Sequence, residues 1–154
     1  LIVLIMKYHG LTGIQQPWQR RFLTLQRNLF SLESSIRFAF KQRAKAYDYK
    51  SYGLPDMSYH GSKAWYADFS HFNRHFSVMY CGKYATIDGK EDEADLFIAY
   101  NMFWEMIKFG IPSARNKSQW KVVFATDSGF KEPSDGIERM LQVPPRSIVV
   151  LMAK

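Results

Sequence analysis

From residue 75 onward the chain repeats one pattern that restricts the folds available to it: short apolar or aromatic runs separated by turn-forming residues. Runs of this length, rich in β-branched and aromatic residues, are typical of strands. We expect a mainly β fold, an antiparallel β-sandwich, because consecutive short strands of this kind pack as two layers. The predicted strands are residues 75–80, 95–101, 103–109, 120–126, 140–143 and 146–153.

Residues 86–95 separate two of these runs and are strongly acidic. The spaced oxygens and the closing Glu of an EF-hand are absent, so a solvated hairpin tip is the preferred interpretation over a calcium site. No other part of the sequence calls for a metal or a cofactor, and we expect neither.

The N-terminal third has a different period. Between Pro17 and Ala46 apolar residues recur at steps of three or four, which places them on one helical face, and Pro17 suits a first helical turn. This apolar stripe consists of Trp18, Phe22, Leu25, Leu29, Leu32, Ile36 and Phe40. The sequence predicts one long helix or two short ones, packed on another element by the stripe.

Length and composition limit the broad class. The 154 residues fit one domain, or one domain plus a piece of another, and 47% hydrophobic residues are typical of a folded globular protein. A single cysteine, Cys81, excludes an intrachain disulfide and favours a reducing compartment, so we expect a cytoplasmic location. In its apolar run Cys81 is expected to be an inert buried thiol.

The first six residues are apolar, against about 20 needed for a membrane helix, and they lack a signal peptide's basic region and cleavage site. We therefore expect no membrane partner, and we expect the chain to be cut from a longer one. The net charge of +7 is concentrated in residues 1–57, which hold nine Lys and Arg against three Asp and Glu. This basic excess leaves a nucleic-acid-binding domain open as a weaker alternative, although no recognised motif accompanies it.

Four segments in order resemble the C-terminal part of isoamylase-type glycogen-debranching enzymes and pullulanases. Residues 52–69 are similar to the junction where the catalytic barrel of that family ends and its β-sandwich begins. The resemblance continues through Asn101–Glu105 with Phe109–Pro112, then Trp120–Asp127, and last Val143–Leu151 with its Arg-Ser pair. Together these segments cover residues 47–154, and their order and spacing make the match more specific than any one of them.

The resemblance implies a division of the chain into three parts. Residues 1–46 correspond to a helical segment from the end of the (β/α)₈ barrel, residues 47–57 to a linker, and residues 58–154 to the accessory sandwich. The implied partner is the catalytic barrel of the same polypeptide, which hydrolyses α-1,6-glucosidic branches. No segment resembles the barrel strands that carry the catalytic carboxylates, so no catalytic residue is assigned and the chain alone is expected to be inactive.

Three aromatic residues, Trp65, Tyr66 and Trp104, are the candidate carbohydrate-binding residues, because flat rings stack on the apolar faces of glucose. Asp68 and Asn73 are polar neighbours that would bind sugar hydroxyls. The alternative for these rings is packing in the sandwich or against the barrel, which we prefer. An independent carbohydrate-binding module therefore stays open as a second function.

Overall fold

The computed structural model describes six stretches of the chain, residues 44–84, 86–87, 90–91, 94–115, 119–133 and 137–153. The predicted helix between Pro17 and Ala46 lies outside them except for its last three residues. Within these stretches the chain forms nine strands and one short 3₁₀ helix, η1 (Gly82–Tyr84).

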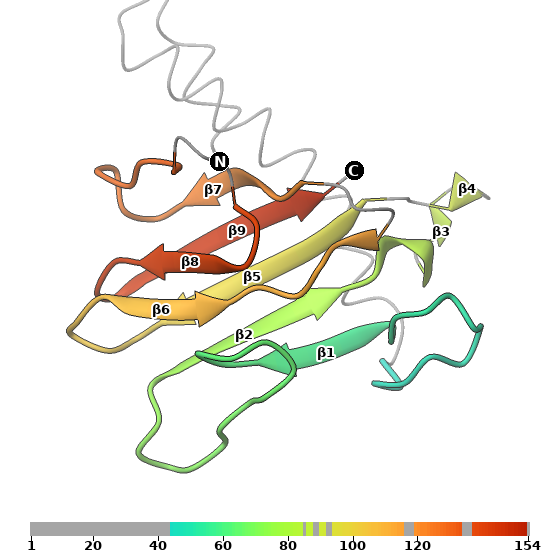
Figure 1. Cartoon of the computed structure of the whole chain (residues 1–154), viewed down its shortest axis with the longest axis horizontal. Helices are drawn as coiled ribbons and strands as arrows, with labels where there is room; N and C mark the ends of the chain where they lie inside the picture. The colour runs from blue at the N-terminus through green and yellow to red at the C-terminus, as the bar shows by residue number, and fades with distance from the viewer. Residues whose placement is uncertain are drawn as a thin grey trace, which may run out of the picture.

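The largest element is a five-stranded antiparallel sheet (Figure 1). Its strands in spatial order are β1 (Met57–His60), β2 (His75–Tyr80), β5 (Asp95–Asn101), β9 (Ser147–Ala153) and β7 (Lys121–Ala125). A bulge between Val122 and Phe124 interrupts the pairing of β7 with β9. The central strand is therefore β5, with β2 and β9 on either side, and the longest apolar runs lie in β5 and β9.

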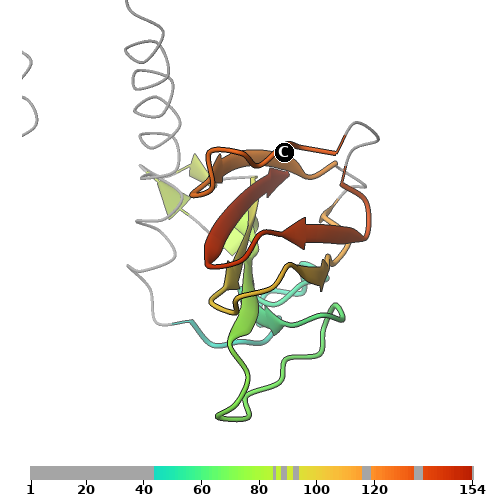
Figure 2. The same cartoon turned by 90° about the vertical axis from the view of Figure 1, so that its left-hand side faces the viewer.

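A second, two-stranded antiparallel sheet pairs β6 (Ile107–Gly110) with β8 (Met140–Val143). Figure 2 shows β6 and β8 on one side of the large sheet. The main core lies between these two layers and includes Met79, Phe97, Phe109, Trp120, Leu141, Val143, Val149 and Leu151. The prediction of a mainly β, antiparallel and sandwich-like fold is therefore confirmed for the described residues.

The opposite side of the large sheet is also apolar, and we call it the outer face. Because side chains alternate across a strand, β5 directs Phe97 and Ala99 to the main core and Leu96 and Ile98 to the outer face. The outer face consists of Tyr80, Leu96, Ile98, Tyr100, Val123, Phe124, Ile148, Val150 and Met152. Continuous apolar runs in β5 and β9 thus reflect burial on both sides of the sheet.

Residues 44–56 precede β1 as irregular chain and are tied to the sheet by two carboxylates. Asp56 accepts hydrogen bonds from the backbone N–H groups of Lys45, Ala46 and Met57, each at 2.8 Å. Asp48 accepts from the N–H of Tyr52 at 2.9 Å and from the hydroxyl of Tyr84 in η1. This segment therefore has a fixed position at the start of β1.

Two expectations need correction. The strand predicted at 103–109 begins only at Ile107, because residues 102–106 form a loop that crosses from the large sheet to the small one. In the acidic segment, β3 (Thr86–Ile87) and β4 (Lys90–Glu91) do form a hairpin. The last residue of the acidic segment, Asp95, begins β5 and is not solvated. It is 1% exposed, and its Oδ1 lies 2.8 Å from Nε of Arg115.

Candidate functional site

Trp65 and Tyr66 lie in a tight turn that follows β1. Lys63 and Tyr66 face each other across a single β-bridge, and both aromatic side chains point away from the core, with 52% of Trp65 and 69% of Tyr66 exposed. Trp65 has a φ of 65°, a left-handed conformation that a bulky residue rarely adopts. The surrounding structure must therefore stabilise this turn.

The buried imidazole of His60 provides that stabilisation. Its Nδ1 accepts a hydrogen bond from the N–H of Trp65 at 2.7 Å, and its Nε2 lies 2.8 Å from Oγ of Ser58. The ring is completely buried and packs edge-on against Trp65, with centroids 4.8 Å apart. An Nδ1 acceptor requires a neutral ring, and burial lowers the pKa of His60 to about 4.

The turn also packs directly on β6. The N–H of Gly110 donates to the carbonyl of Gly61 at 3.3 Å. A Cβ atom at Gly110 would lie 2.3 Å from the backbone nitrogen of Ala64, so a side chain there cannot be accommodated without moving the turn. β6 and His60 together hold Trp65 and Tyr66 in place.

Trp104 lies in a different loop, between β5 and β6. Its ring stacks on Phe103 with centroids 4.0 Å apart, and 59% of it is exposed. The loop is held by the buried side chain of Asn101, whose Nδ2 lies 2.8 to 3.0 Å from the carbonyls of Glu105, Val143 and Pro144. The Oδ1 of Asn101 accepts from the N–H of Phe103 at 3.0 Å.

The structure thus brings two of the three candidate rings together and leaves the third apart. Trp65 and Tyr66 share the turn that contacts Gly110 at the end of β6, whereas Trp104 precedes the start of that strand by three residues. A four-residue strand is about 13 Å long, so the two positions flank β6 rather than forming one site.

The polar neighbours do not complete a sugar site. The amide of Asn73 is used within its own loop: Nδ2 donates to the carbonyls of Asp68 and His75, at 2.6 and 2.8 Å, and Oδ1 accepts from the N–H of His75. Asp68 accepts from the N–H of Ser70 at 2.9 Å, and that backbone hydrogen bond lowers the pKa of its carboxyl group. Asn73 and Asp68 therefore serve mainly to hold their own loop.

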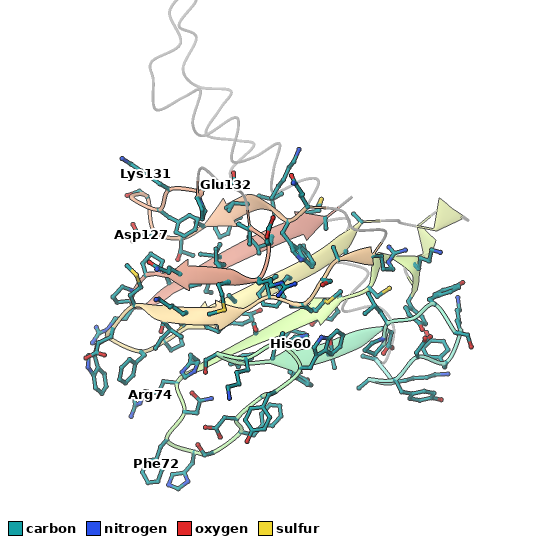
Figure 3. All side chains as sticks on the ribbon, in the orientation of Figure 1. His60, Phe72, Arg74, Asp127, Lys131 and Glu132 are labelled. Carbon is teal, nitrogen blue, oxygen red and sulfur yellow. The ribbon has the colours of Figure 1, made fainter. Side chains whose placement is uncertain are left out.

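Two exposed aromatics in the β1–β2 loop were not among the candidates. Phe69 is 71% exposed and contacts Tyr59 edge-on at 5.4 Å, and Phe72 is 79% exposed. Figure 3 shows Phe72 at the far end of that loop, beyond Arg74. Both lie in a largely polar segment without regular alternation of apolar and polar residues, and this pattern indicates a loop in which aromatic side chains can be exposed.

Other chemistry is limited within the described stretches. They contain no group of three His, Cys, Asp or Glu residues placed to hold a metal ion. Cys81 is fully buried, as expected, and burial raises the pKa of its thiol. The described part of the chain also has no helix of the length and apolar character needed to span a membrane.

No protein-family model matches the chain, and no curated protein sequence matches it significantly.

Proposed function

We propose that this chain is the non-catalytic C-terminal portion of a glycoside hydrolase that cleaves α-1,6-glucosidic branches in glycogen or a related α-glucan. The observation that carries the proposal is the ordered resemblance over residues 47–154. The resembling segments fall on structural units: the junction on β1 and its turn, Asn101–Glu105 on the end of β5 and the loop after it, Trp120–Asp127 on β7, and Val143–Leu151 on the end of β8, the turn after it and most of β9. The antiparallel, sandwich-like fold supports the same assignment.

In this proposal residues 1–46 are the end of a (β/α)₈ barrel, residues 47–57 join it to the sandwich, and the barrel is the domain's partner. The tie between Asp56 and the backbone of Lys45 and Ala46 supports a rigid joint rather than a free linker. A cytoplasmic location belongs to the same proposal, because the buried free thiol of Cys81 suits a reducing compartment.

The chain itself carries no assigned part of the hydrolysis. A retaining glycosidase needs two carboxyl groups about 5 Å apart across the scissile bond, and the family supplies them from barrel strands. The sandwich would instead cover an apolar flank of the barrel and support its last helix. Contact with α-glucan through exposed rings is a secondary contribution.

The upstream coding sequence tests this proposal. We expect it to encode a barrel with carboxylates after its middle strands, because the resemblance places the chain directly downstream of them. An upstream region without such strands, or with an unrelated domain, would overturn the assignment.

One observation favours an independent carbohydrate-binding module as a second candidate. Trp65 and Tyr66 are both more than half exposed in a turn that is stabilised from behind, which is the arrangement of a rigid stacking platform. Affinity electrophoresis in glycogen gels separates the candidates. Tyr47, in the segment before β1, is a matched exposed tyrosine and serves as the control. Retardation that is lost in Tyr66→Ala and kept in Tyr47→Ala would support the module. A wild-type chain that is not retarded would exclude it.

A further inference from the structure

The outer face of the five-stranded sheet requires a covering element. All nine described members of this cluster belong to β2, β5, β7 and β9, so they come from the sheet itself. The main core on the other side differs, because β6 and β8 supply Phe109, Leu141 and Val143 as a second layer. Within the described stretches, then, only one face of the sheet has a partner sheet (Figure 2).

The centre of the outer face is nevertheless buried. Leu96, Ile98 and Val150 are 3, 8 and 5% exposed. Side chains stand roughly perpendicular to a sheet, so their neighbours on the same face shield their flanks but not their tips. Burial also raises the pKa of Tyr80 and of Tyr100 at the ends of the face. An apolar surface of this size left in water would be costly and would favour association.

We propose that residues 17–40 of the same chain cover the outer face through their apolar stripe. The stripe presents seven large apolar side chains at helical spacing, from Trp18 to Phe40. Over those residues a helix is about 33 Å long, whereas the sheet is about 19 Å wide and β5 about 23 Å long. One helix laid diagonally across the sheet therefore reaches every strand of the outer face.

The short connection between the stripe and the start of β1 is consistent with this contact. Lys45 is held by Asp56, immediately before β1, and Met57 pairs with Tyr80 of the outer face. Four residues lie between Phe40 and Lys45, so these two positions are at most about 18 Å apart when the chain is extended. The end of the stripe is thus confined to a distance from Lys45 that is smaller than the width of the sheet.

This inference does not rest on the debranching assignment, since it uses only the outer face, the stripe and the connection between them. It differs from that assignment in one respect: a helix at the end of a (β/α)₈ barrel would pack its apolar stripe on the barrel, whereas here the stripe lies on the sheet. The other occupants of the face to be distinguished are a second copy of the chain and a separate domain.

Photo-crosslinking in the full 154-residue chain tests the inference. p-Benzoylphenylalanine would replace Tyr100 on the outer face, and the products would be mapped by mass spectrometry in a mixture of ¹⁴N and ¹⁵N chains. We expect cross-links within one chain to residues 17–40. The same probe at Phe72, in the β1–β2 loop, should give none to that segment. Cross-links between labelled and unlabelled chains, or none to residues 17–40, would overturn the inference.

A matched pair of variants supplies the second test. Leu29→Asp places a charge on the stripe, whereas Asn28→Asp places the same charge one position away, off it. In the Tyr100-labelled chain we expect loss of the cross-link in Leu29→Asp and its retention in Asn28→Asp. Equal cross-linking in both variants would contradict docking through the stripe. Cross-links to residues 17–40 would show that the stripe packs on the sheet rather than on a barrel, whereas the upstream sequence decides separately whether a catalytic barrel precedes the chain.

Discussion

Stability is expected to fall between pH 7 and pH 4 because His60 is buried as the neutral imidazole. The ring is completely buried, and burial lowers its pKa from the ordinary value of 6.5 to about 4. Above pH 6.5 neither the folded nor the unfolded chain holds this proton, so the group has no effect on stability. Below pH 6.5 the unfolded chain takes up the proton and the folded chain does not, which favours unfolding.

The size of this loss follows from the pKa difference. One pKa unit corresponds to 1.36 kcal/mol, and some solvation of the charged ring reduces the full value, so we expect a loss of about 2 to 3 kcal/mol by pH 4. Below pH 4 the folded chain is protonated as well, and the contribution of His60 levels off. A loss of this size is a substantial part of a typical total stability of about 5 to 15 kcal/mol.

Urea unfolding at half-unit steps from pH 7.5 to pH 4 measures the effect, with two variants as controls. His60→Asn leaves an oxygen that can accept from the N–H of Trp65 but does not titrate, so the decrease over this range should shrink by about 2 to 3 kcal/mol. His71→Asn, in the exposed β1–β2 loop, should retain the wild-type decrease. Parallel curves for the wild type and His60→Asn would refute the reasoning.

Three further substitutions test individual contacts. Asn101→Ala should cost about 2 to 4 kcal/mol in urea unfolding, because it leaves buried carbonyls near Nδ2 and the N–H of Phe103 without their partner, and a loss under 0.5 kcal/mol would contradict this. Gly110→Ala should destabilise the protein by about 1 to 3 kcal/mol, because the added Cβ would lie 2.3 Å from the backbone nitrogen of Ala64. Gly129→Ala should cost less, because its Cβ would meet only a side-chain oxygen at 3.3 Å. Equal losses of stability in the two variants would argue against the close contact at Gly110. Asp56→Asn should speed tryptic cleavage after Lys45 by weakening its backbone anchor, and an unchanged cleavage rate would show that the anchor is unimportant.

The sequence predicted most of the strands because they are short apolar or aromatic runs separated by turn-forming residues. The runs at 75–80, 95–101 and 140–143 match β2, β5 and β8 in both bounds. The run at 120–126 exceeds β7 by one residue at each end, and the run at 146–153 exceeds β9 by one residue at its start. The four-residue strand β1 was not predicted, because Met57–His60 is short and its burial does not follow hydropathy: the polar His60 is buried, whereas Tyr59 is exposed.

The missed features depend on contacts between residues far apart in the chain. Asp95 looked solvated in its acidic surroundings, but its partner Arg115 is twenty residues away. Packing was the preferred interpretation for Trp65, yet 52% of this residue is exposed in the described structure. Its left-handed backbone and its hydrogen bond to His60 could not be predicted from sequence, since both arise when the turn packs on β6. The local sequence pattern therefore indicated which aromatic residues lie in loops. Their backbone conformation and hydrogen bonds depend on tertiary packing.

The most direct test of the account compares the release of reducing sugar from glycogen and pullulan by two polypeptides. One is the 154-residue chain, and the other is the same chain extended through its upstream coding sequence. The account predicts that the chain alone releases none, because the proposed function assigns the catalytic carboxylates to an upstream barrel, and that the extended polypeptide cleaves α-1,6 bonds. Turnover that co-purifies with the chain alone, or an extended polypeptide that leaves both glucans intact, would contradict the account.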